Sequence, residues 1–217
     1  MFSFFKKEKK EKLSLIVDIQ SGLVRGALIM NKETGETHVL YVITKTMPVK
    51  SHRNSTYLIK MMLKAFSEVV SILSKHHRIS FINVILSSPW IISHSKTIKV
   101  NFENDTIISE NIINNIIEKE RENLEEQLRQ NHSKISDTQS DLKYIEQKIF
   151  EIRLNGYTVN KYIGRVAKNI DVSFATTLSS EKILKRKNMI INKHLTHLED
   201  ICFHSGLLMN FLALRNI

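Results

Sequence analysis

The 217-residue chain carries a formal net charge of +10, and 42% of its residues are hydrophobic and 25% charged. These fractions are ordinary for a globular protein and exclude a chain that is disordered throughout. A single cysteine excludes an internal disulfide framework. No apolar run approaches the ~18 residues of a membrane-spanning helix, so we expect a cytoplasmic protein. The basic residues are dispersed, and no aromatic residues interleave with a basic run, so nucleic-acid binding is not expected.

The first twelve residues form a basic tail, predicted to span 1–12. Phe2, Phe4 and Phe5 precede a run of lysines. Phenylalanines beside lysines suit contact with an anionic membrane surface. A frayed, solvated terminus is the alternative.

The segment Leu13–Met30 reads as two apolar strands joined by a short polar turn, which is a hairpin pattern. Backbone N–H groups in such a turn can form an anion-binding concavity, and a neighbouring carboxylate can hold hydrated Mg²⁺. A surface hairpin, whose turn merely requires polar residues and a glycine, is the alternative. The candidate binding residues are Asp18, Gln20, Ser21 and Gly22, with Asp18 also the candidate metal ligand.

A third strand is predicted over 38–45, followed by a helix that is capped by Ser55 or Thr56 and runs to about Lys75. Phe81–Leu86 is a nearly continuous apolar run, which predicts a central strand covered on both faces. Strands and a helix in this order predict an α/β fold with a mixed sheet.

The next part of the chain alternates between strand and helix patterns. Thr97–Phe102 reads as part of a hairpin. Ser109 begins an amphipathic helix whose glutamates, Glu120 among them, are expected on a solvated outward face. A polar loop is expected over Arg129–Asp141.

A second compact unit is indicated between Lys148 and Leu178. An alternating strand ends at Leu154, and Asn155-Gly156 is the strongest two-residue hairpin signal. A turn at Ile163-Gly164-Arg165 and an alternating strand over Ile170–Leu178 follow. These patterns predict a small antiparallel sheet beside the preceding helix.

Ser180 is predicted to cap a last helix, whose buried stripe includes Ile183, Lys187 and Cys202. Gly206 is expected to end that helix, and Leu207–Leu214 is expected to be an apolar strand. The cluster of His194, His197, Cys202 and His204 has spacings that a zinc site could use. On one continuous helix these side chains lie on two different faces, so no metal site is expected, and Cys202 is interpreted as a core thiol.

The order of these elements resembles the actin-like family that contains FtsA of cell division and PilM of type IV pilus assembly. The most specific part is EIRLNGYTVNKYIGRVAKNIDVSFA, Glu151–Ala175, which resembles the insert subdomain of FtsA. The resemblance implies an actin-like (ribonuclease H-like) mixed-sheet lobe formed by 13–88 and 179–217. It implies a small α/β insert subdomain over 89–178.

The resemblance places Asp18, Gln20, Ser21 and Gly22 in the family's first phosphate loop. Members usually have glycine where Gln20 stands, and glycine lets a phosphate approach the backbone closely. The family's second phosphate loop and its Gly-Gly adenosine motif would follow Leu214 and are not in this sequence. Mg-ATP is therefore expected only if a second lobe is supplied, and no catalytic residue is assigned.

The resemblance implies a non-catalytic scaffold or assembly protein that acts by protein–protein interaction at the inner face of the cytoplasmic membrane. Its partners would be proteins of cell division or type IV pilus assembly, with self-association included. The alternative is the N-terminal portion of an ATP-binding, actin-like ATPase.

Overall fold

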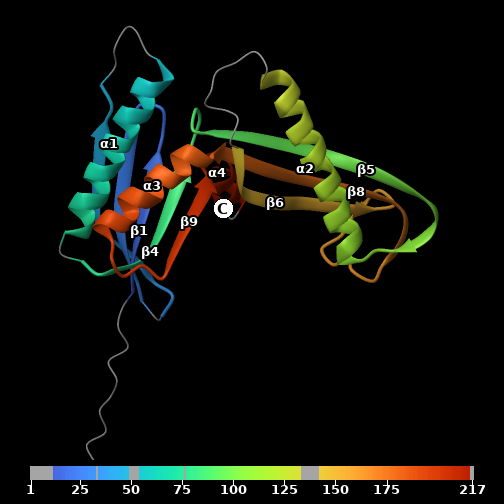
Figure 1. Cartoon of the computed structure of the whole chain (residues 1–217). Coiled ribbons are helices and arrows are strands. Elements are labelled where there is room, and N and C mark those ends of the chain that lie inside the picture. The colour runs from blue at the N-terminus through green and yellow to red at the C-terminus, as the bar shows by residue number, and fades with distance from the viewer. Residues whose placement is uncertain (1–11, 33, 49–53, 76, 133–141, 216–217) are drawn as a thin grey trace, which may run out of the picture. The chain divides into compact units, whose positions relative to one another are not determined.

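The computed structural model describes residues 12–32, 34–48, 54–75, 77–132 and 142–215 (Figure 1). The chain divides into two compact units. Unit 1 comprises Met1–Trp90 and Ile183–Ile217, and unit 2 comprises Ile91–Lys182. The membrane-contact prediction for Phe2, Phe4 and Phe5 lies outside the described residues.

Unit 1 contains a five-stranded mixed sheet. Its strand order is β3-β2-β1-β4-β9, in which β1 pairs antiparallel with β2 and parallel with β4, and β4 pairs parallel with β9. The strands are β1 (Lys12–Ile19), β2 (Leu23–Asn31), β3 (Thr37–Thr46), β4 (Ile79–Leu86) and β9 (Asp200–Ser205). The carboxyl ends of the parallel strands β1, β4 and β9 therefore share one edge of the sheet.

The predicted hairpin of β1 and β2 is present, and its register follows the apolar alternation. Leu15, Val17 and Ile19 of β1 are fully buried, and Val17 lies opposite Gly26 of β2. Paired residues in adjacent strands point to the same face, so these three side chains share one face of the sheet with Gly26.

The helix α1 (Ser55–Ser74) covers that face. A Cβ atom added to Gly26 would lie 2.4 Å from Cγ1 of Val69 and 2.7 Å from Cδ1 of Leu73, so glycine permits the close approach of β2 and α1. The cap was predicted one or two residues late: Asn54 precedes the helix, and its side-chain oxygen accepts a hydrogen bond from the N–H of Tyr57 at 2.7 Å.

The helix α3 (Glu181–His194) lies beside α1 on the same sheet (Figure 1), and Ser67 Oγ of α1 is 3.2 Å from His194 Nε2. The predicted continuation of this helix to Cys202 is wrong, because residues 200–205 form β9. Parallel pairing with β4 overrides the local helical spacing there. Cys202 is only half-buried on β9 and is not a core thiol.

The last element is the helix α4 (Gly206–Arg215), so the predicted strand over Leu207–Leu214 and the predicted terminal role of Gly206 are wrong. A short apolar run has the same appearance in a strand and in a helix. This run consists mostly of leucine, methionine and alanine, which favour helix, and contains no β-branched residue.

Unit 2 is a four-stranded antiparallel sheet with one helix. The strand order is β5-β8-β6-β7. Its elements are β5 (Ile91–Ile107), α2 (Glu110–His132), β6 (Leu142–Leu154), β7 (Tyr157–Thr158) and β8 (Val166–Ser180). The predicted strand over Thr97–Phe102 is thus the middle of a longer one, and α2 extends through His132 into the predicted loop.

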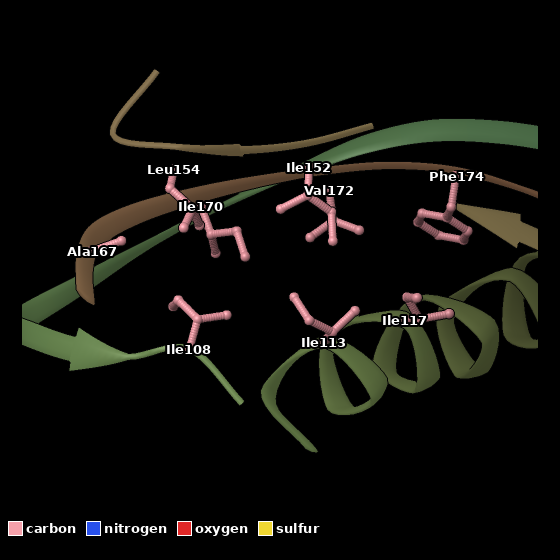
Figure 2. Packing of buried hydrophobic residues seen from close by; sticks show 9 residues of the cluster. All are labelled: Ile108, Ile113, Ile117, Ile152, Leu154, Ala167, Ile170, Val172 and Phe174. Carbon is pink, nitrogen blue, oxygen red and sulfur yellow. The ribbon is translucent and has the colours of Figure 1, made fainter. Parts of the chain in front are cut away.

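The core of unit 2 lies between α2 and one face of its sheet. Figure 2 shows Ile113 and Ile117 of α2 pointing toward Val172 and Phe174 of β8, and all four are buried. The complete cluster consists of Ile108, Ile113, Ile117, Ile152, Leu154, Ala167, Ile170, Val172 and Phe174.

The predicted Asn155-Gly156 turn joins β6 and β7. Asn155 and Gly156 have φ values of 50° and 84°, the left-handed conformation that a two-residue hairpin of this sequence requires. The side-chain oxygen of Asn155 also accepts hydrogen bonds from the N–H groups of Lys168 (2.9 Å) and Asn169 (3.2 Å) of β8. The turn is therefore tied to the strand that follows.

Two predictions of burial need correction. Glu120 is buried rather than outward-facing, because it lies three residues after Ile117 on the buried stripe of α2. Lys96 of β5 balances its charge, with Nζ 2.8 Å from Glu120 Oε1. The strand β4 lies inside the sheet as predicted, but burial alternates along it, so Asn83 and Ile85 on the second face are only half-buried.

Lys187 of α3 lies on the predicted buried stripe, and its side chain is fully buried. Its Nζ atom has no hydrogen-bond partner among the described residues. Burial disfavours the charged ammonium and lowers the pKa of Lys187 to about 7.

The predicted α/β fold class is confirmed. Unit 1 has a mixed sheet with helices, and a smaller α/β unit follows β4 and precedes α3 in the sequence.

We expect Gly26→Ala to lower the free energy of unfolding by about 1–3 kcal/mol, because the added methyl group would overlap Val69 and Leu73. Gly22→Ala is the matched control, since a Cβ there meets nothing within 4 Å. Urea unfolding followed by circular dichroism measures both variants. Equal stabilities would contradict the close approach of β2 and α1.

We expect Lys187→Met to raise the free energy of unfolding at pH 7.5 by on the order of 3–4 kcal/mol. The lysine binds its proton more weakly in the folded state (pKa about 7) than in the unfolded state, so wild-type stability should rise with pH above 7. The variant should lack this rise. Urea unfolding at pH 7.5 and pH 9.5 tests it, and the same pH dependence in both proteins would refute the assignment.

Candidate functional site

The candidate phosphate loop connects β1 and β2. Asp18 is the second-last residue of β1, and Gln20, Ser21 and Gly22 form the connection to Leu23. Asp18 alternates with Val17 and Ile19 along the strand, so its carboxylate lies on the face of the sheet opposite α1. The structure thus brings the four predicted residues together in one short turn.

The side chain of Gln20 is hydrogen-bonded to one of the two carboxylate oxygens of Asp18. The amide Nε2 of Gln20 donates a hydrogen bond to Oδ2 of Asp18 at 2.7 Å. The backbone N–H of Gln20 donates to the carbonyl of Leu23 at 3.0 Å, which closes the turn. Both Gln20 donors are therefore used within the turn and are not available to a phosphate. One carboxylate oxygen of Asp18 is already hydrogen-bonded to the side-chain amide of Gln20.

The segment after β4 holds this turn in place. Trp90 Nε1 donates a hydrogen bond to the carbonyl of Gln20 at 2.9 Å, and the N–H of Ser87 donates to the carbonyl of Ile19 at 3.0 Å. Sequence analysis missed Trp90 as part of the site. The available signal was that it follows a parallel strand, because such strands end at the same edge of a sheet.

The two glycines at this edge differ in what they allow. Gly22 has open space around it, so neither packing nor a left-handed backbone requires glycine there. A Cβ atom at Gly206, the first residue of α4, would lie 2.3 Å from Oγ of Ser87. Glycine at 206 therefore permits the close packing of the end of β4 against the start of α4.

This edge has the general location of ligand sites in open α/β sheets, outside the carboxyl ends of the parallel strands. A carboxylate beside a polar turn can hold a hydrated magnesium ion. Mg²⁺ bound by Asp18 would have to share the carboxylate with the amide of Gln20, or displace it.

His194, Cys202 and His204 of the predicted cluster have separate partners, and His197 is exposed. His194 contacts Ser67 of α1, His204 Nε2 lies 3.1 Å from Asn83 Oδ1 of β4, and Cys202 Sγ lies 3.3 Å from an oxygen of Asp200. Burial and the neighbouring Asp200 raise the pKa of the Cys202 thiol. Within the described ranges, no three His, Cys, Asp or Glu residues are grouped in a way that could hold a metal ion.

None of the helices in the described part of the chain is both long and apolar enough to span a membrane.

No protein-family model and no curated protein sequence matches the chain. Among solved structures, the cytoplasmic domain of EpsL, an inner membrane component of the type II secretion system of Vibrio cholerae, is similar over 89% of this chain and 57% of its own. Its identity is 12% and its TM-score is 0.39. The PilM–PilN type IV pilus biogenesis complex is similar over 88% of this chain and 47% of the other, at 9% identity and a TM-score of 0.40.

Diol dehydratase-reactivating factor is similar over 90% of this chain and 64% of its own, at 9% identity and a TM-score of 0.31. The chain therefore spans less than two thirds of each of these three proteins. These neighbours have actin-like folds. The likeness is too weak to indicate a function.

Proposed function

We propose that this protein is a non-catalytic scaffold that acts by protein–protein interaction in a pilus, secretion or division assembly at the cytoplasmic face of the membrane. The observation that carries the proposal is an exposed apolar patch on unit 2. The resemblance of Glu151–Ala175 to the insert subdomain of FtsA supports it as a sequence argument. The domain boundaries implied by that resemblance are part of the proposal.

The unit 2 patch consists of Ile107, Ile163 and Val166, whose side chains are 65%, 62% and 54% exposed. Ile107 of β5 and Val166 of β8 are directly paired. Ile163 is close to them, because the next residue, Gly164, donates its N–H to the carbonyl of Ile108 at 2.8 Å. Contiguous exposed apolar side chains favour a binding surface, since water hydrates them at a cost that a partner removes.

The turn at Asp18 supports a non-catalytic role. A nucleotide site of this kind needs a free carboxylate and free backbone donors for a magnesium ion and a phosphate. Here the side-chain amide of Gln20 donates a hydrogen bond to Asp18, and its backbone N–H donates to the carbonyl of Leu23. The glycine that members of the resembled family usually have in place of Gln20 would leave the carboxylate of Asp18 without this amide.

The scaffold proposal predicts that the full-length chain, used as bait in its own cells after mild cross-linking, captures envelope-assembly proteins. Ile163→Lys with Val166→Lys should abolish that capture, because two charges would be desolvated at the interface. Met189→Lys is the matched control, since Met189 is an exposed apolar residue (71%) on unit 1. Mass spectrometry compares the captured proteins. Identical capture by the patch variant and the control would refute the role of the patch.

The second candidate is an actin-like ATPase portion, in which Asp18 positions Mg²⁺ and the backbone of Ser21 and Gly22 contacts phosphate. The location of Asp18 at the carboxyl edge and the open space around Gly22 favour it.

Titration with Mg-ATP separates the two candidates, because the single tryptophan, Trp90, bonds to the candidate loop and its fluorescence reports on it. The scaffold proposal predicts no saturable change at millimolar Mg-ATP, in the wild type or in Asp18→Ala. Saturable binding that is lost in Asp18→Ala but kept in Asp171→Ala, a control on unit 2, would favour the ATPase portion.

A further inference from the structure

The edge strand β3 of unit 1 is the most apolar exposed segment of the described chain. It forms one border of the five-stranded sheet and pairs only with β2. Four consecutive side chains are exposed: Val39 (61%), Leu40 (39%), Tyr41 (58%) and Val42 (60%). Edge strands carry unpaired backbone groups, and natural proteins usually protect them with charges, proline, short length or a β-bulge. This strand has ten residues, no proline and a single lysine, Lys45.

An irregularity at Leu40 determines which side chains share a face. Leu28 of β2 pairs with Tyr41, but the next residue, Ile29, pairs with Val39, so Leu40 is an extra residue on β3. Ala27 pairs with Val42, and Ala27 and Ile29 are two residues apart on one strand. Val39 and Val42 therefore point to the same face, although simple alternation would put them on opposite faces.

The same irregularity allows the free edge of β3 to pair antiparallel with the β3 edge of a second copy of the chain. Along a strand, the backbone N–H and C=O groups of successive residues point alternately to its two sides. Two residues that lie opposite each other in an antiparallel pair must therefore both direct these groups toward the partner strand, or both away from it. Val39 and Val42 satisfy this requirement, because their partners on β2 are two residues apart. An antiparallel copy of β3 can thus place Val39 opposite Val42, with Leu40 and Tyr41 at the centre.

We propose that β3 pairs antiparallel with β3 of a second copy of this chain about a two-fold axis between Leu40 and Tyr41, which joins two five-stranded sheets into one. Val39 of each copy lies opposite Val42 of the other. The association goes beyond the proposed function and does not depend on it, because it uses unit 1 and no other partner.

Charge complementarity favours a second copy over an unrelated strand. Continuing the register outward from Val39 and Val42 places Thr37 opposite Thr44 and Glu36 opposite Lys45, once at each end of the strand pair. The side chains of Glu36 and Lys45 are 62% and 38% exposed. Opposite charges across a strand pair stabilise it, and like charges directly opposed destabilise it. Val39 and Val42 of the two copies also become cross-strand neighbours, which reduces the apolar area that each exposes to water.

Sedimentation velocity of the full-length chain tests the pairing. The wild type should form a dimer, and Val39→Lys with Val42→Lys should be monomeric at the same concentrations, because four lysines would meet in the joined sheet. Tyr157→Lys with Met189→Lys is the matched control, since these exposed apolar residues (78% and 71%) lie outside β3 and outside the unit 2 patch, and this variant should still dimerise. A monomeric wild type, or a dimer that survives the β3 substitutions, would overturn the proposal.

Charge reversal tests the register. Glu36→Lys alone and Lys45→Glu alone each oppose like charges at both ends of the pair and should weaken the dimer by about tenfold or more. The double variant restores opposite charges and should recover wild-type affinity. Circular dichroism verifies that each variant is folded, since Lys45 also lies 3.4 Å from Glu68. No recovery in a folded double variant would exclude this register.

Cysteine cross-linking distinguishes β3 pairing from other dimers. In a Cys202→Ser background, Val39→Cys mixed with Val42→Cys should give a cross-linked heterodimer under mild oxidation, faster than either variant gives a homodimer. Equal rates for all combinations would contradict the proposed opposition of Val39 and Val42.

Discussion

Parallel pairing of β1 with β4 and of β4 with β9 is the constraint on which the structure of unit 1 depends. It brings together strands that are separated in the chain by β2, β3 and α1 in one case and by unit 2 and α3 in the other. Because parallel strands end at a common edge, the turn after β1, the segment after β4 and the start of α4 meet there. The hydrogen bonds from Trp90 to Gln20 and from Ser87 to Ile19 follow from this pairing.

Polar groups at that edge bond mainly to one another. Asp18 accepts from Gln20, Gln20 closes its own turn, and Trp90 secures it. Such mutual bonding stabilises the turn, but it also reduces what the turn offers to a ligand. Exposed apolar side chains lie on the unit 2 patch, on β3 and on α4. This distribution favours macromolecular contact over small-molecule chemistry as the use of the fold.

Buried charge has opposite consequences in the two units. Glu120 of unit 2 is buried with Lys96 as an ion-pair partner, so its charge is compensated. Lys187 of unit 1 is buried without a hydrogen-bond partner in the described chain, so nothing there compensates its desolvation, and burial lowers its pKa. Removing Glu120 would leave Lys96 without its partner, whereas replacing Lys187 with an apolar side chain removes only a penalty.

Local sequence determined the elements whose signals lie within a few residues. The β1–β2 hairpin, α1 and the Asn155-Gly156 turn were predictable, because alternation, helical spacing and left-handed turn residues act locally. The tertiary structure decided that residues 200–205 form β9, since β4 supplies their pairing. The helix over Leu207–Leu214, by contrast, agrees with the local composition of that run. The tertiary structure also decided the role of Trp90, the ion pair of Glu120 with Lys96 and the face of Val39, because each depends on a neighbour distant in the chain. A single sequence specifies such neighbours only through the fold as a whole.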